Sequence, residues 1–366
     1  MIGGTQREPS VQRRLGRSKK HLIAWWSCEL YGGRPAIQIH APRDKPLPHG
    51  PRPPEPATGE ERWLDVGRRL AEAEHAFAHT VYLGEAFPFL HTEIGPGSLA
   101  LHLGSSATLH TNTVWYEPCL ASLAQTEEIR RDPDEPYWQV TMQLVREGVR
   151  RGKGKYLTSV PDLIENLDTL SSLRGNEELL VDLIEEPEHV HRLLAQIQRH
   201  WYDVFDAIYE LIKDEDGGCC FTGFEIWGPG KTAKLQSDIS YMLSPKMFRE
   251  FALPGFREQT DWLDYSLYHW DGPGAIPHLD ALLELPKLHA IQWVPGAGDE
   301  PVHDPRWFPL YRRMRDAGKG LLFTGARADK VETLYREFGP EGVMASCSVK
   351  SEAEGRRLLE ESAGWV

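Results

Sequence analysis

The chain has 366 residues, 40% of them hydrophobic and 10% aromatic, so it can bury a full core and does not have the composition of a disordered protein. Its net charge of −13 argues against a nucleic-acid partner, whose phosphates are bound by clustered lysine and arginine. No run of 18 apolar residues predicts a membrane helix, and five scattered cysteines without a signal segment predict a cytoplasmic protein with reduced thiols.

The N-terminal region is expected to hold a tail, a loop and a helix, in that order. The first 20 residues, MIGGTQREPSVQRRLGRSKK, are basic and polar and lack the apolar segment of a signal peptide. We expect a flexible basic tail over residues 1–20 and one domain over residues 21–366. Residues 41–61 are rich in proline and charge without periodicity, which predicts a surface loop, and residues 62–84 have apolar residues at helical spacing.

Beyond residue 85, short apolar runs alternate with longer amphipathic segments. The runs end in small or polar residues, and they include KYLTSVPD, CCFTGFEIWGPG, SLYHWDGPG, HAIQWVPGAG, GLLFTGA and VMASCSVKS. This order predicts parallel strands with helices outside them. We expect a single-domain α/β fold, a TIM (β/α)8 barrel with an N-terminal elaboration, because the polar residues of interest follow the strands. An open doubly wound sheet is the alternative.

Two features of this region predict no chemistry. Residues 225–232, EIWGPGKT, are similar to a phosphate-binding loop, but Glu225 stands where that motif needs its first glycine and Pro229 lacks a backbone N–H. Cys219 and Cys220 are adjacent in a strand-like run, so they face opposite sides and cannot share a metal. We expect both cysteines to lie in the core.

The segment YHWDGPG places two potential metal ligands at a strand end. His269 and Asp271 are two residues apart, so an extended backbone points both side chains to the same face. Cys347 ends another apolar run, and nitrogen, oxygen and sulfur ligands with an open fourth position suit a catalytic zinc. Alternatively, Asp271 caps the next helix, His269 is a hydrogen-bonded core residue and Cys347 is a structural thiol. The residues alone leave both interpretations open.

Three segments resemble the uroporphyrinogen decarboxylase superfamily. SDISYMLSPKMFREFALPGFREQTD resembles its SPxMFxEFxLP helix, and HWDGPGAIPHLDALLEL resembles its strand-end histidine with a glycine turn and a helix. LRGNEELLVDLIEEPEHVHRLLAQI is similar to its G-x-E-x-L-L-x-D-L segment with the following P-E-x-V-H. The resemblance covers roughly residues 150 to 362 and implies a TIM barrel.

The resemblance is closer to the methyltransferase branch of this superfamily than to the true decarboxylases. The decarboxylases carry the stretch R-x-P-V-W-x-M-R-Q-A-G-R-Y, which binds substrate carboxylates, whereas this chain reads HLIAWWSCELYGGRPAIQIH. The corrinoid- and thiol-dependent methyltransferases bind zinc with a His-x-Cys pair and a distant Cys. The resemblance implies His269 and Cys347 as ligands, with Asp271 in place of the middle Cys. Since carboxylate is a harder ligand than thiolate, another divalent metal and a different substrate stay open.

The function implied is a zinc-dependent methyl, or other C1-group, transferase that activates a thiol or similar nucleophile on a small molecule. His269, Asp271 and Cys347 would hold the metal and take part in catalysis at the C-terminal mouth of the barrel. The chain has no D-x-H-x-x-G motif, so a corrinoid would come from a separate partner protein. The alternatives are a metal-free decarboxylase of a carboxylated ring or small acid, with Asp238 as its acidic residue, and a non-catalytic binding barrel.

Four further residues stand at or shortly after expected strand ends and are candidate substrate contacts: Glu225, Trp227, Asp238 and Trp293. Each tryptophan could instead pack in the core or at its rim, and Asp238 could instead cap the following helix. The sequence does not indicate the oligomeric state.

Overall fold

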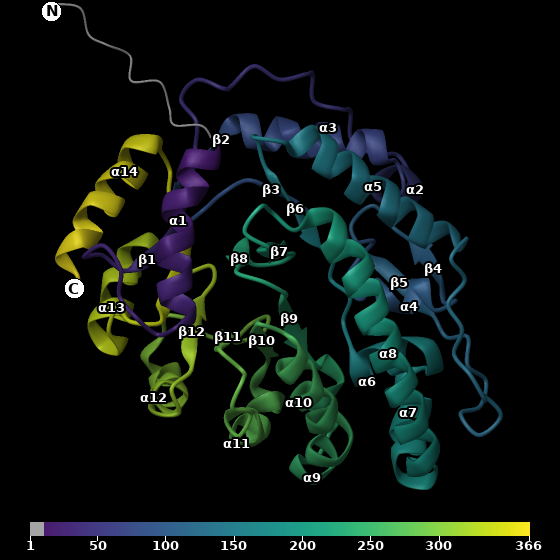
Figure 1. Ribbon diagram of the computed structural model, residues 1–366. Helices are drawn as coiled ribbons and strands as arrows, with labels where there is room; N and C mark the ends of the chain where they lie inside the picture. Colours follow the sequence, from purple (N-terminus) through teal and green to yellow (C-terminus); the bar gives the residue numbers. More distant parts are fainter. Residues whose placement is uncertain (1–10) are drawn as a thin grey trace, which may run out of the picture.

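The computed structural model describes residues 11–366, which form an α/β fold. Helices follow one another in an arc around the outside of the strands, from α14 through α12 and α10 to α8 and α5 (Figure 1). The helices are α1 (Val11–Trp26), α2 (Gly59–Trp63), α3 (Val66–His79), α4 (Leu99–His102), α5 (Pro136–Gly152), α6 (Asn166–Arg174), α7 (Asn176–Glu185), α8 (Pro187–Ile212), α9 (Pro245–Met247), α10 (Leu253–Trp262), α11 (Leu279–Leu283), α12 (Phe308–Asp316), α13 (Val331–Phe338) and α14 (Glu352–Glu361).

The strands form two main sheets and one hairpin. They are β1 (Ala36–Pro42), β2 (Thr80–Gly84), β3 (Phe89–Leu90), β4 (Ser106–Leu109), β5 (Val114–Glu117), β6 (Leu157–Val160), β7 (Cys219–Phe221), β8 (Ile226–Gly228), β9 (Thr232–Gln236), β10 (Tyr265–Asp271), β11 (Ala290–Val294), β12 (Gly320–Phe323) and β13 (Val343–Ser348). The larger sheet has the order β2-β1-β13-β12-β11-β10-β9, the smaller one β3-β6-β7-β8, and β4 pairs with β5.

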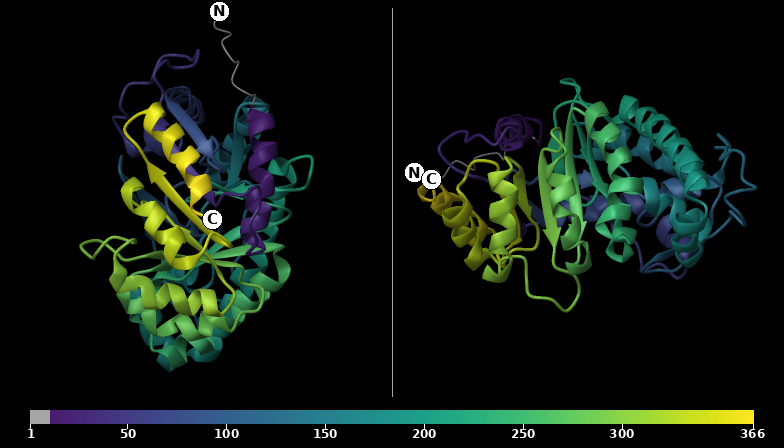
Figure 2. Two further views of the ribbon diagram at one scale, coloured as in Figure 1. Left: turned by 90° about the vertical axis from the view of Figure 1, so that its left-hand side faces the viewer. Right: turned by 90° about the horizontal axis from the view of Figure 1, so that it is seen from below.

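Parallel pairing dominates both sheets, as the alternation of apolar runs and amphipathic segments predicted. In the larger sheet only β2 is antiparallel to its neighbour, and in the smaller sheet only β8 is. Over residues 11–366, the hydrogen-bonded ladders give two sheets and not one closed ring. Helices flank the strands when the molecule is seen from below (Figure 2). The parallel α/β architecture is therefore confirmed, and the ladders alone do not close it into a barrel.

The expected N-terminal tail is partly helical. Residues 1–10 lie outside the described residues, and residues 11–20 belong to helix α1. Leu15 and Ser18 of this helix are buried, and the Lys19 ammonium lies 2.9 Å from a carboxylate oxygen of Asp214. An apolar stripe among the basic residues thus packs α1 onto the domain.

The other local expectations were met more closely. Residues 43–58 connect β1 to α2 without helix or strand, as predicted for the proline-rich loop. Helix α3 follows, but the helical pattern stops at His79, where pairing with β1 turns residues 80–84 into strand β2. After Lys231, strand β9 begins at Thr232 in place of the helix that follows a phosphate-binding loop. Cys219 and Cys220 are both buried, as predicted for core residues.

No helix within residues 11–366 is both long enough and apolar enough to cross a membrane.

Candidate metal and substrate site

Strand β10 presents His269 and Asp271 on one face. Tyr268 and Trp270, on the other face, pack against Phe256 of α10 and Trp293, at ring-centroid distances of 5.2 and 4.5 Å. Because side chains alternate along a strand, His269 and Asp271 point away from this packing, to the side where Phe224 lies. The predicted pairing of these two residues on one face is present in the structure.

Asp238 joins this pair. It is the first residue of a 3-10 helix, Asp238–Met242, that follows strand β9, the neighbour of β10 in the sheet. One possible ligand atom from each of Asp238, His269 and Asp271 lies within 4.8 Å of the other two. A residue expected to contact substrate therefore stands among the candidate metal ligands.

Cys347 faces the opposite way. Strands β1 and β13 align Ile39 with Cys347, so these two side chains share a face. Ile39 packs against helix α14. Its Cγ2 atom lies 3.3 Å from the position that a Cβ atom would have at Gly355 of that helix. Gln38, on the other face, donates a 2.6 Å hydrogen bond to the Glu225 carbonyl, towards the candidate site.

Cys347 is therefore not brought to His269, contrary to the ligand set that the family resemblance implied. The reason is the pleat of strand β13, which turns the thiol to the helical layer. The thiol is buried, and this burial raises its pKa to about 12, so it carries a proton at neutral pH.

Hydrogen bonding fixes the ring of His269. Its Nδ1 atom lies 2.5 Å from Oε1 of Gln292, whose amide nitrogen donates a 2.8 Å hydrogen bond to Thr324 Oγ1. Since the amide oxygen only accepts, Nδ1 carries the proton and the lone pair of Nε2 is available. Burial, followed by the charge of Lys234, lowers the pKa of His269. The imidazole is thus neutral and oriented, as a metal-binding histidine must be.

Carboxyl groups crowd this end of the strands. Burial, reinforced by the charge of Asp238, raises the pKa of Asp168 to about 7. Its carboxylate accepts the backbone N–H groups of Asp238 and Ile239 at 2.7 and 2.9 Å and so caps the 3-10 helix. Burial also raises the pKa values of Asp238 and Asp271. A cation bound between these carboxylates would lower their mutual repulsion.

The donor set fits a divalent metal. One imidazole nitrogen and two carboxylates are ligands that zinc accepts, and they also suit harder metals such as manganese or iron(II). The set does not contain the thiolates of the family pattern. Asp238, His269 and Asp271 therefore fit a site for zinc or a related divalent metal, with carboxylate ligands in place of thiolates.

A cavity of about 510 Å³ extends to Glu225, the residue that follows Phe224. Its polar lining includes Arg69, Glu72, Tyr82, His91, Glu93 and Glu225. Glu225 pairs with Nε2 of His40, and its backbone has a φ of 54°, a left-handed conformation that non-glycine residues adopt rarely. Its neighbour Phe224 packs near the His269 ring, at a centroid distance of 5.5 Å, and so connects the lining of the cavity to the candidate metal ligands.

A partly exposed pair, His91 and Glu93, forms one wall of this cavity. The Thr222 hydroxyl donates to Glu93 at 2.7 Å, and His91 Nδ1 lies 3.1 Å from the same carboxylate. Burial acts to raise the pKa of Glu93, but the charge and hydrogen bond of His91, together with the charge of Arg69 and the hydrogen bond of Thr222, outweigh it and lower the pKa to about 2. Burial acts to lower the pKa of His91. The charge and hydrogen bond of Glu93 act in the opposite direction, and the net result is a raised pKa of His91.

The two tryptophans predicted to contact substrate are packing residues. Trp227 is 1% exposed and donates its Nε1 proton to Asp214 at 2.8 Å, beneath the Lys19 side chain. Trp293 is also 1% exposed and lies between Trp270 and Trp307. Neither side chain lines the cavity, whereas Glu225 does.

Several polar residues of the site were missed by the sequence analysis. Lys234 forms a 2.6 Å ion pair with Asp162, and Glu165 accepts the backbone N–H of Gln236 at 2.6 Å. Gln292 orients His269. The sequence contains a signal that could have identified these residues. They are polar residues within or directly after short apolar runs, as in SVPD, TAKLQ and AIQWV. Such positions mark the end of a strand, where binding and catalytic sites form.

Comparison with known proteins finds similarity among solved structures. No protein-family model matches the chain, and a search of curated proteins finds no match. Among solved structures, the chain is similar to a methyltransferase from Methanosarcina mazei, with a TM-score of 0.60 and 12% sequence identity. The similarity covers 95% of this chain and 98% of that chain. It establishes that the two proteins share a fold over nearly their entire lengths.

Proposed function

We propose that this chain is a methyl or other C1-group transferase of the uroporphyrinogen decarboxylase-like superfamily, with a divalent metal, zinc in the first place, bound by Asp238, His269 and Asp271. The convergence of these three side chains at the ends of the neighbouring strands β9 and β10 carries the proposal. The fold shared with a methyltransferase supports it.

The proposal includes a TIM barrel as the complete architecture. Ties between the two sheets support this: Lys234 of β9 pairs with Asp162 after β6, and Gln236 of β9 donates its backbone N–H to Glu165. The ends of strands from both sheets thus meet at the candidate site, as they do at the C-terminal mouth of a barrel.

The bound metal would supply Lewis acidity, lowering the pKa of a thiol or similar nucleophile so that the anion forms at neutral pH. In the proposed site His269 contributes Nε2, and Gln292 keeps the ring in place by accepting from Nδ1. Asp238 and Asp271 contribute carboxylate oxygens in place of thiolates. This harder set donates less charge to the metal, which favours a nucleophile other than the thiol of the thiolate-rich enzymes.

The substrate would occupy the 510 Å³ cavity, beside Glu225 and the His91–Glu93 pair. In the transfer, the substrate nucleophile forms a bond to the methyl carbon while the donor–carbon bond breaks and its electron pair stays on the donor. A corrinoid on a separate partner protein is the proposed donor, and it would dock over the carboxyl ends of the strands.

Metal-free decarboxylation is the second candidate, and one observation favours it. Desolvation raises the pKa of Asp238, which is the direction that a general acid needs in order to protonate a carbanion left by loss of carbon dioxide. The metal content of the protein separates the two functions.

The decisive experiment measures metal content and methyl transfer on the same preparations. Protein purified without chelators is expected to contain zinc or another divalent metal at Asp238, His269 and Asp271, and Asp271→Asn or Asp238→Asn should lose it. Asp316→Asn, a change of an exposed aspartate at the end of helix α12, is the matched control. Methylcobalamin with a panel of small nucleophiles then tests transfer by the cobalamin spectrum. Metal-free protein that decarboxylates a carboxylated substrate would replace this proposal by the second one, and inactivity in both assays would favour a binding barrel.

A further inference from the structure

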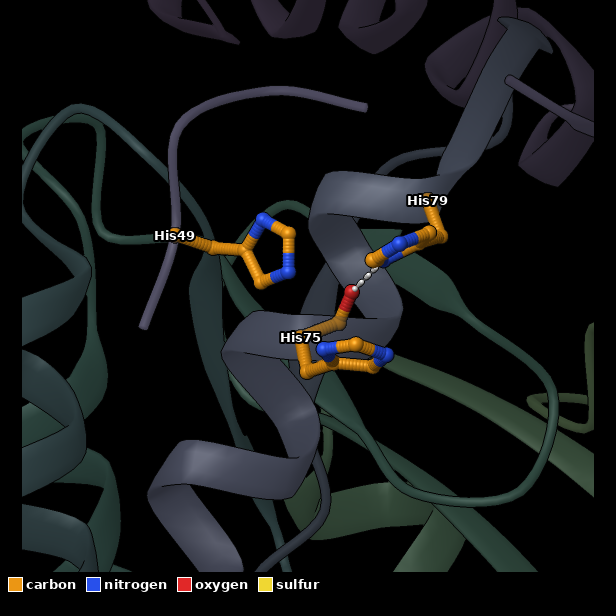
Figure 3. A group of neighbouring side chains, drawn as sticks. All are labelled: His49, His75 and His79. Atoms are coloured by element: carbon orange, nitrogen blue, oxygen red, sulfur yellow. Dashed lines mark hydrogen bonds between the residues drawn. The ribbon is translucent and has the colours of Figure 1, made fainter. Parts of the chain in front are cut away.

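Three histidines form a second cluster away from the candidate site. His75 and His79 are one turn apart on helix α3, and His49 comes from the proline-rich loop of residues 43–58. One ring nitrogen of each lies within 4.8 Å of the other two. The ring centroids are 4.7 Å apart for His49 and His75, 4.6 Å for His49 and His79, and 4.1 Å for His75 and His79. Figure 3 shows the His49 ring directed from the loop towards the helix.

Backbone hydrogen bonds set the tautomers of two of these rings. Nδ1 of His79 lies 2.8 Å from the His75 carbonyl oxygen, and Nδ1 of His49 lies 2.8 Å from that of Leu47 (the first contact is dashed in Figure 3). A carbonyl oxygen only accepts, so each Nδ1 carries the proton and each Nε2 has a free lone pair. This is the arrangement found in metal-binding histidines, whose second nitrogen donates to a backbone carbonyl.

The third ring has a nitrogen without a partner. Nδ1 of His75 is buried and makes no hydrogen bond among the residues that the structure describes. This unpartnered nitrogen of His75 and the Nε2 atoms of His49 and His79 are electron-pair donors that a bound cation would satisfy.

We propose that His49, His75 and His79 bind a divalent transition metal, zinc by preference, at a site separate from Asp238, His269 and Asp271. Imidazole ligands suit zinc, copper and nickel, and three of them leave a fourth position open. Tetrahedral zinc with bonds of about 2.0–2.1 Å holds its nitrogen ligands about 3.4 Å apart, which small side-chain rotations reach from the present spacing. His75 also lines a cavity of about 580 Å³ with Arg52, Glu55, Arg62 and Glu72, from which water or an anion can reach the fourth position.

The metal would fasten the proline-rich loop to helix α3. The same helix presents Arg69, Glu72, Ala73 and Ala76 to the 510 Å³ cavity beside the candidate site. Metal binding by this triple-histidine site would therefore hold one wall of that cavity in place. This role does not depend on the function proposed above.

The test is a zinc titration of the full chain, stripped of metal, against a chromophoric chelator. His75→Ala and His79→Ala should each lose one zinc equivalent, with binding weakened at least about 100-fold, the upper end of the effect of losing a supporting hydrogen bond. His110→Ala removes an exposed histidine on the β4–β5 hairpin and should bind zinc as the natural chain does. His49→Ala gives a variant in an exposed loop that leaves the core untouched, if a helix variant fails to fold.

Hydrogen exchange supplies a second readout. Zinc should slow exchange of the backbone amides within residues 44–52 of the natural chain, and not in His75→Ala or His49→Ala. Asp271→Asn should retain this protection, because it alters only the other site, so failure of the two proposals can be told apart. Equal zinc stoichiometry and affinity in the natural chain and all three histidine variants of the cluster would overturn the inference.

Discussion

The ion pair of His91 and Glu93 should make a measurable, pH-dependent contribution to stability. Glu93 accepts from Thr222, lies 3.1 Å from Nδ1 of His91, and lies near the buried guanidinium of Arg69. Glu93→Gln keeps the size of the side chain and an acceptor for Thr222 but removes the charge. The Arg69 guanidinium and the His91 ring then lose the carboxylate that they face.

The magnitude follows from the pKa of Glu93, which falls from 4.5 to about 2 on folding. At about 1.4 kcal/mol per pKa unit, this corresponds to about 3 kcal/mol of extra stability when Glu93 is ionised. Because the His91 side chain is 50% exposed, water screens part of the attraction, and about 2–3 kcal/mol is the expected loss at pH 7. A depressed carboxyl pKa stabilises the fold above the unfolded value of 4.5, and this is lost as pH falls towards 2.

Urea unfolding of the natural chain and Glu93→Gln between pH 7 and pH 3 measures this contribution. The difference in unfolding free energy should be full at pH 7 and shrink steadily below pH 4.5. Glu210→Gln removes an exposed carboxylate paired with Lys213 and should cost less than about 1 kcal/mol. A difference that stays constant over this pH range, or is absent at pH 7, would refute the pairing of Glu93 with His91.

Three further predictions concern the metal ligands and the core. Cys347→Ser should leave the metal content unchanged. In the native protein, iodoacetamide should modify the exposed Cys119 before Cys347, because Cys347 is buried and this burial raises the pKa of its thiol to about 12. Mass spectrometry follows the order of modification. Gln292→Leu should weaken metal binding about 10–100-fold in a competition titration. Gln292→Glu restores an acceptor for His269 Nδ1 and should recover the affinity. Equal affinity in the natural chain and both variants would contradict the orienting role of Gln292. Arg34→Ala should lower the unfolding free energy by about 3–5 kcal/mol in urea, since it leaves the fully buried Glu85 carboxylate without its bidentate partner, and a loss below about 1 kcal/mol would show that the pair is unimportant.

Local sequence patterns determined the elements of this protein and part of its site. The alternation of short apolar runs with amphipathic segments is a property of neighbouring residues, so it correctly predicted parallel strands, outer helices and the loop before α2. The two-residue spacing of His269 and Asp271 fixed their common face for the same reason, because side-chain alternation is built into an extended backbone. The buried positions of Cys219 and Cys220 also followed from a purely local run.

The tertiary structure decided which side chains meet. The sequence placed Cys347 at a strand end but could not fix the phase of its pleat against β1, which turns the thiol towards α14. The sequence did not distinguish Asp238 from Trp227 or Trp293 as a site residue. Only the pairing of β9 with β10 brings Asp238 to His269. Contacts across large sequence separations also assemble the His91–Glu93–Thr222 network and bring His49 onto helix α3. Such contacts depend on the order of the strands and on their register, and sequences with the same local pattern can differ in both.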